Sequence, residues 1–158
     1  MNRERLLDST GWKILDELQR DARLSYNELA RRVGLTTPAV RERVSCMEEA
    51  GMITGYHARV DPRQVGYQVS AFVRITVTGD ERTARRLAAE AAEMPEVMEC
   101  HRCTGDHAFI LRAEATSVEH LERLIDRLTG YGMTSTSIVL SSPLPRSIVL
   151  NPAGRKRK

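Results

Sequence analysis

The first fifty residues contain two short helical patterns separated by a turn that begins with glycine. Ser25 and Glu28 have the spacing of a capping box, in which the serine hydroxyl accepts from an amide of the first turn and the glutamate reaches back. Gly34 predicts the end of that helix, because glycine adopts the left-handed conformation at a helix C-terminus. Threonine and proline at positions 36–38 open the next helix. A helix, a turn of about four residues and a second helix is the spacing of a helix-turn-helix.

The second of these helices has one apolar face for packing and one polar outer face. Val40, Val44 and Met47 share the inner face. The outer face and the start of the helix carry residue types that contact base edges and phosphates in a major groove, namely Thr36, Thr37, Pro38, Arg41, Glu42 and Ser45. We expect none of them to be needed for packing. Arg41 is the best base-edge candidate, because arginine reads guanine with two hydrogen bonds. Any three-helix bundle has such an outer face, so a purely structural bundle also fits.

The hydrophobic period changes near residue 61. Residues 53–60 are a β-rich stretch, and turn-forming residues place a linker at 61–67. The elements expected beyond it are a strand over 69–77, a helix over 81–93 with Ala84, Leu87, Ala88 and Ala91 inside, strands over 97–103 and 108–115, a helix capped by Thr116, and a strand over 136–141. This βαββαβ order is a ferredoxin-like unit. The predicted class is α+β, with a helical domain at 1–60, a ferredoxin-like domain at 68–142 and a tail at 143–158.

One face of the expected sheet lacks a helical cover. Both helices of a ferredoxin-like unit cover the same face. The other face carries Phe72, Arg74 and Thr76 from the first strand. A small sheet with a partly apolar open face usually pairs with another copy, so we expect a homodimer.

The positive charge of the chain lies at its end. Lysine and arginine total 24 against 21 acidic residues, but residues 155–158 are all basic, and without them the net charge is −1. Such an end is usually solvated. It could add weak, salt-sensitive affinity for nucleic acid.

Several classes of protein are disfavoured. No apolar run approaches the ~20 residues of a membrane span, the N-terminus lacks a signal-like apolar stretch, and three cysteines cannot build a closed disulfide framework, so we expect a cytoplasmic protein. Phosphate-loop, dinucleotide and nucleophile-elbow motifs are missing, so we expect no enzyme, no catalytic residues and no cofactor. Cys100 and Cys103 flank His101, but on a strand they point to opposite faces, which argues against a metal site. His120 is expected on the exposed side of the last helix.

These stretches together resemble the Lrp/AsnC (feast/famine) transcription regulators over residues 6–142. The strongest match is IL-x-x-L-x-x-x-x-R from Ile14 to Arg23, followed by LSYNELARRVGL, then ERV at 42–44, EEAGMITGYHARVDP at 48–62 and ECHRCTGDH at 99–107. The resemblance implies a winged helix-turn-helix that binds double-stranded DNA, and an effector-sensing βαββαβ domain. It also implies dimers that assemble into larger discs, commonly octamers.

The resemblance also implies an effector pocket at the glycine turn. It maps to Thr104, Gly105, Asp106, His107 and Ala108, with Thr136 contributed across a subunit interface. The family often has aspartate where this chain has Ala108, and an ammonium group would lose its partner there. We therefore expect weak or absent binding of simple amino acids. The family also has aspartate where this chain has Gly11, so Asp8 or Thr10 should cap the first helix instead.

Three functions remain open at this point. The first is an oligomeric, sequence-specific DNA-binding transcriptional regulator of the Lrp/AsnC type, open to modulation by a small-molecule effector. The second is a nucleoid-type architectural protein that binds DNA with little sequence preference. The third is a small-molecule-binding or enzymatic ferredoxin-like protein. Mobility shifts at two salt concentrations separate the first two, because architectural binding is mostly electrostatic.

Overall fold

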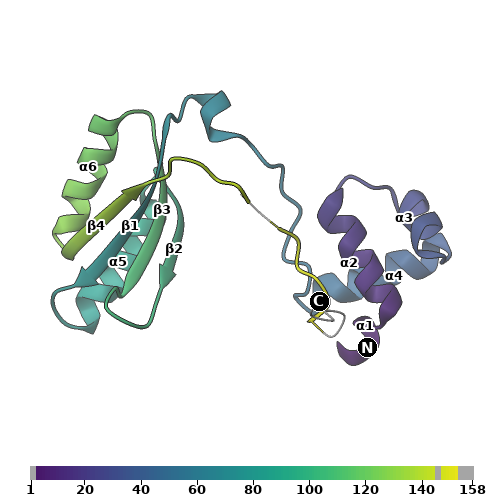
Figure 1. Cartoon of the computed structure of the whole chain (residues 1–158). Coiled ribbons are helices and arrows are strands. Elements are labelled where there is room, and N and C mark those ends of the chain that lie inside the picture. The colour runs from purple at the N-terminus through teal and green to yellow at the C-terminus, as the bar shows by residue number, and fades with distance from the viewer. Residues whose placement is uncertain (1–2, 145–146, 153–158) are drawn as a thin grey trace, which may run out of the picture. The chain divides into compact units, whose positions relative to one another are not determined.

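The computed structural model describes residues 3–144 and 147–152, so the basic end at 155–158 lies outside the described residues. The chain divides into two compact units. The helical unit comprises residues 1–58 and 144–158, and the sheet unit comprises residues 59–143 (Figure 1). No helix in the described ranges is both long enough and apolar enough to cross a membrane.

The helical unit is built around the predicted helix-turn-helix. Its helices are α1 (Arg3–Leu6), α2 (Ser9–Arg20), α3 (Tyr26–Val33) and α4 (Thr37–Glu49). Gly34 ends α3 at φ +74°, and Thr36 caps α4 by accepting from the Ala39 amide at 3.4 Å. Ile14, Leu29 and Val40 are fully buried in the core of the unit. The helix-turn-helix is therefore confirmed, with its turn where the sequence places it.

The capping box of α3 is only half formed. The Ser25 hydroxyl accepts from the Glu28 amide at 3.2 Å, as predicted. The Glu28 carboxylate pairs instead with Arg31 at 2.8 Å and with Arg32 at 2.9 Å. Two arginines one turn further along the helix thus hold the Glu28 side chain, which was expected to reach back to the start of α3.

The sheet unit has the predicted βαββαβ order. Its elements are the short 3-10 turn η1 (Pro62–Val65), β1 (Val69–Val77), α5 (Glu81–Glu93), β2 (Val97–Arg102), β3 (Phe109–Ala115), α6 (Val118–Thr129) and β4 (Gly132–Ile138). The strands lie in the order β2-β3-β1-β4, and each neighbouring pair is antiparallel. Both α5 and α6 cover the same face of the sheet (Figure 1). Val73, Ile75, Leu87, Leu111 and Leu124 are fully buried in the core between sheet and helices.

The last strand was predicted too late. It runs over Gly132–Ile138 rather than 136–141. Gly132 permits this early start because it lies at φ +155°, and a Cβ there would come within 2.1 Å of the Thr76 carbonyl oxygen. Gly132, the first residue of β4, therefore allows close pairing with β1.

Residues 53–60 do not form the expected β element. They form no helix or strand and pair with no strand within the described residues. The Ile53 amide instead donates to the Met47 carbonyl at 3.3 Å, and the Tyr56 hydroxyl donates to Glu48 at 2.8 Å. These two contacts hold Ile53 and Tyr56 against the end of α4. A composition that favours strands does not form one without a neighbouring strand to pair with.

Three smaller predictions need correction. Ala88 is exposed, because α5 turns Ala84, Leu87 and Ala91 toward the core and leaves position 88 beside that stripe. The cap of α6 is Ser117 rather than Thr116, and it accepts from the His120 amide at 3.2 Å. β2 ends one residue before the predicted bound of 97–103, and β3 starts one residue after the predicted start of 108–115.

Candidate DNA-binding and effector sites

The first turn and outer face of α4 present most of the predicted DNA-contacting side chains to solvent. Thr36, Pro38, Arg41, Glu42 and Ser45 are exposed. Thr37 is half-buried, and its hydroxyl donates to the Asn27 side-chain oxygen at 2.9 Å. That hydrogen bond joins α4 to α3, so the prediction that Thr37 has no packing role is wrong. The remaining five side chains are open to solvent at the start of α4 and along its next two turns.

Arg41 is held in place rather than free. Its guanidinium carbon lies 5.4 Å from the centre of the Tyr26 ring, at the start of α3. A cation over an aromatic face at this distance is attracted by about 0.5–1 kcal/mol at an exposed site. The contact with Tyr26 corrects the expectation that Arg41 has no packing role, and it restricts the directions in which the guanidinium can reach.

An ion pair fixes α4 against the start of α2. The Asp8 carboxylate accepts from both terminal nitrogens of Arg43, at 2.8 Å and 2.7 Å. It also accepts from the Gly11 amide at 2.7 Å, which makes Asp8 the N-cap of α2 and confirms one of the two expected caps. The hydrogen bonds from Arg43 and Gly11 lower the pKa of Asp8 to about 2. Sequence reasoning missed the Arg43 contact, because 35 residues separate the partners.

The predicted effector residues 104–108 form one tight turn between β2 and β3. The Cys103 amide donates to the Ala108 carbonyl at 2.8 Å and closes the turn. Gly105 lies at φ +99°, a conformation that favours glycine. Thr104, Gly105 and Asp106 are exposed, whereas His107 and Ala108 are half-buried. The structure therefore brings these five residues together.

Thr76 ties this turn to β1. Its hydroxyl donates to the Asp106 carbonyl at 2.8 Å and lies 3.0 Å from His107 Nδ1. Because the single hydroxyl proton is used on Asp106, the threonine oxygen must accept from His107 Nδ1–H. A neutral His107 then keeps Nε2 as a hydrogen-bond acceptor. Alternation in the sequence placed Thr76 on the open face, but it could not predict a role in the turn, because the contact spans thirty residues.

Two effector candidates face the helix-covered side of the sheet. Ala108 packs against the core of the sheet unit and offers no polar atom from its side chain. Thr136 lies opposite Val73 in the pairing of β1 with β4, and Val73 is fully buried beneath the helices. Within one chain Thr136 is therefore not part of the glycine turn. Its contribution from a neighbouring subunit stays a prediction.

The open face of the sheet is more polar than the sequence suggested. Arg112 pairs with Glu99 at 2.8 Å and with Glu114 at 3.0 Å. Arg74 donates to the hydroxyls of two β4 residues, Ser135 at 3.3 Å and Ser137 at 2.9 Å. Phe72 stands among these groups with 40% of its surface exposed. A partner for this face must therefore combine apolar contact with charged or hydroxyl groups.

A buried carboxylate lies at the other end of the sheet unit. Glu96 is 8% exposed and accepts from Arg127 at 2.8 Å and from His120 at 3.0 Å. Burial alone would raise the pKa of Glu96, but the hydrogen bonds from Arg127 and His120 outweigh it and hold that pKa below its usual value. His120 is thus half-buried in an ion-pair cluster, and the prediction that it is exposed is wrong.

The cysteines form no ligand set with their neighbours. Cys100 packs against the core, where burial raises the pKa of its thiol, and the Cys103 thiol lies 3.7 Å from the His101 carbonyl. Among the described residues, no three side chains of His, Cys, Asp or Glu gather closely enough to hold a metal ion.

Comparison with known proteins finds matches to both units. The family model described as the AsnC-type helix-turn-helix domain matches residues 7–48, and that of the Lrp/AsnC ligand binding domain matches residues 70–149. The chain is 37% identical over 136 residues to the uncharacterized HTH-type transcriptional regulator YezC of Bacillus subtilis. This match covers 86% of the chain and 95% of the relative.

Solved structures agree over a similar length. LrpC of Bacillus subtilis superposes with a TM-score of 0.83 and 32% identity, covering 89% of this chain and 99% of that one. A transcriptional regulator of Neisseria meningitidis, solved as a complex with L-Met, superposes with a TM-score of 0.84 and 28% identity, covering 94% and 97%. Both the helix order and the sheet are thus shared with proteins of nearly the same length.

Proposed function

The chain belongs to the Lrp/AsnC family of transcriptional regulators, and from this we infer that α4 reads double-stranded DNA while the glycine turn of the sheet unit senses a small molecule. The single observation that supports DNA reading most is the exposed surface at the start of α4 behind a formed helix-turn-helix. The relatives are regulators by name, which favours regulation over the architectural alternative. The proposal includes no enzymatic activity, and it places the protein in the cytoplasm together with the DNA that it would bind.

Arg41 is the residue on which sequence readout should depend most. A guanidinium held over Tyr26 and directed from the outer face of α4 is suited to two hydrogen bonds with guanine. We expect Arg41→Ala to weaken specific binding by about 1–3 kcal/mol, or roughly 5- to 150-fold. Arg85→Ala, which removes an exposed arginine of α5, is the matched control. Mobility shifts with equal loss in both variants would contradict the assignment.

The phosphate-contacting residues should behave differently from Arg41. Thr36 and Thr37 lie at the start of α4, where backbone amides and the helix dipole favour an anion. Pro38, Glu42 and Ser45 complete the surface.

Specific binding should keep a roughly 10³- to 10⁷-fold preference over random DNA, whereas architectural binding should lose its affinity with salt on every sequence alike.

The effector should not be a simple amino acid bound in the usual way. The glycine turn exposes backbone groups that suit a carboxylate, but Ala108 offers no partner for an ammonium. The Asp106 carboxylate is exposed and has no ion-pair partner within the described residues. We expect calorimetry across the amino acids to find no sub-millimolar ligand. If one binds, Asp106 becomes the ammonium partner, and Asp106→Ala should abolish that binding.

The open face supports a homodimer, from which larger assemblies such as octamers would be built. Phe72 is the exposed apolar residue at its centre. We expect Phe72→Glu to lower the sedimentation coefficient of the full chain, because it replaces the apolar contact at the centre of the face with a charged group that loses its water in the interface. Val118→Glu, at an exposed valine on the first turn of α6, is the control. Equal sedimentation of the two variants would exclude this face as the interface.

A further inference from the structure

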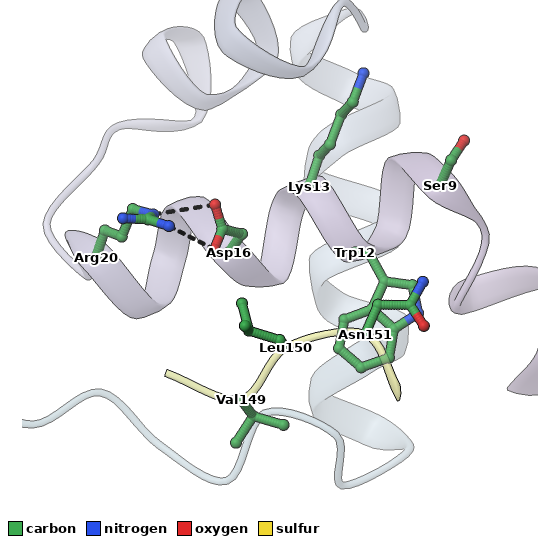
Figure 2. A pocket seen from close by; sticks show the side chains of 8 residues that line it. All are labelled: Ser9, Trp12, Lys13, Asp16, Arg20, Val149, Leu150 and Asn151. Atoms are coloured by element: carbon green, nitrogen blue, oxygen red, sulfur yellow. Dashed lines mark hydrogen bonds and ion pairs between the residues drawn. The ribbon is translucent and has the colours of Figure 1, made fainter. Parts of the chain in front are cut away.

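The end of the chain returns to the helical unit after the last strand. Residues 147–152, called here the C-terminal strap, lie along α2 within that unit (Figure 2). The Gln19 side chain donates from Nε2 to the Val149 carbonyl at 3.0 Å and accepts from the Val149 amide at 2.8 Å. One amide side chain therefore satisfies both backbone groups of a strap residue, as a neighbouring strand would.

The strap runs in the opposite direction to α2. Val149 is bound to Gln19 near the end of α2, whereas Asn151 lies beside Trp12 near its start (Figure 2). The Leu150 side chain points toward α2 and the Val149 side chain points away, as in an extended segment (Figure 2). A groove of about 340 Å³ lies between the strap and α2, and its lining includes Trp12, Asp16, Leu150 and Asn151.

The stripe of α2 that meets the strap is not part of the hydrophobic core. Asp16 lies four residues after Trp12, and Gln19 lies three residues after Asp16, so the three side chains share one face of the helix. The core of the unit uses Ile14 of α2 and, among the described residues, contains nothing from the strap. The helical unit is thus packed without the strap, and the stripe is a surface on which the strap lies.

We propose that this stripe of α2 is a docking site for the strap of the same chain, and that docking assigns the basic C-terminal end to the DNA-binding unit. The occupant is the chain's own strap, because the Gln19 side chain binds both backbone groups of Val149 of the same chain within one compact unit. Only eight residues, 139–146, join the end of β4 to the strap.

The assignment of the basic end follows from chain length and rests on the proposed function. Arg155 follows Asn151 by four positions, which limits the distance between their Cα atoms to about 14 Å. The rest of the chain carries a net charge of −1, so residues 155–158 are its main excess of positive charge. Basic side chains within that reach of a helix-turn-helix would contact phosphates without reading sequence.

Cross-linking tests the docking independently of DNA. The full chain would carry Gln19→Cys and Val149→Cys after serine replacement of Cys46, Cys100 and Cys103, and would be treated with a short bis-maleimide. We expect a cross-link within one chain, which changes its migration in denaturing gels without doubling its mass. A covalent dimer would show that the strap comes from another copy, and no cross-link would show that the strap does not dock. Either result overturns the proposal.

The fluorescence of Trp12 provides a second test of docking, because Trp12 is the only tryptophan in the sequence. A chain ending at Leu144 removes the strap and should shift the emission of Trp12 to longer wavelength, since Asn151 and Leu150 no longer shield it. A chain ending at Pro152 keeps the strap and should emit as the full chain does. Gln19→Ala should resemble the shorter chain, with Gln64→Ala as its control. An unchanged spectrum in the chain ending at Leu144 would overturn the docking.

The salt dependence of DNA binding tests the role of the basic end. Each phosphate contact adds about 0.9 to the slope of log affinity against log salt, so loss of four cations should lower the slope by up to about 3.6 in the chain ending at Pro152. Gln19→Ala keeps the four cations but releases the strap from α2, so its slope should fall between that of the full chain and that of the chain ending at Pro152. An unchanged slope in the truncated chain would overturn the assignment of the basic end. If the proposed function fails instead, no chain binds DNA while the cross-link still forms.

Discussion

Replacing Asp8 with alanine should lower the free energy of unfolding of the helical unit by about 2 kcal/mol. The carboxylate performs two tasks, because it caps α2 at the Gly11 amide and accepts two hydrogen bonds from Arg43. Loss of an N-cap costs about 1 kcal/mol. The lowering of the Asp8 pKa to about 2 would correspond to about 2.4 kcal/mol for a shielded group. The side chain is 43% exposed, however, so solvent screening reduces the ion pair to about 1 kcal/mol.

Urea unfolding followed by Trp12 fluorescence measures this effect in the helical unit. Asp8→Asn is the matched variant, because its amide oxygen can still cap α2 while its charge is gone, so it should lose only about 1 kcal/mol. The folded pKa lies below the usual value of 3.8, so the contribution of the charge is present above about pH 4 and is lost as the pH falls toward 2. If Asp8→Asn matches the parent protein at pH 7, the ion pair does not stabilise the unit and the reasoning is refuted.

Three further substitutions test the packing of the two units. Val44→Asp should unfold the helical unit, because the residue is 1% exposed and the new charge would have no partner; circular dichroism should show the loss of helix. Gly132→Ala should destabilise the sheet unit by more than about 2 kcal/mol, since its Cβ would meet the Thr76 carbonyl, and a change below 0.5 kcal/mol in thermal unfolding would contradict this. Arg127→Met should cost about 1–3 kcal/mol by depriving buried Glu96 of its cation, and the loss should shrink in a Glu96→Gln background.

Local chemistry explains why much of the fold could be predicted from the sequence. Alternation over 69–77 matches β1 residue for residue, and the pattern over 81–93 matches α5. The turn between α3 and α4 was predictable because Gly34 and Thr36 act on backbone groups within four residues of themselves. In each case the residues that determine the element lie inside or beside it.

The contacts that escaped prediction join residues far apart in the chain. Asp8 meets Arg43, Thr76 meets the glycine turn, and Gln19 binds Val149 across 130 residues. Helical periodicity gave no reason to bury His120, because its partner Glu96 lies on the far side of β2 and β3 in the sequence. The glycine turn could therefore be located from the sequence. The side chains that fix this turn to β1 and that fix the helices to one another could not.

The return of the strap makes the sheet unit an insertion in the chain. Residues 59–143 interrupt a helical unit whose two pieces are residues 1–58 and 144–158. An exchange of sensor domains between regulators that replaces everything after residue 58 would thus remove part of the DNA-binding unit along with the sensor. A hybrid protein should instead be joined twice, at residues 58 and 144, so that the foreign sensor is inserted as a cassette and the native C-terminus is retained.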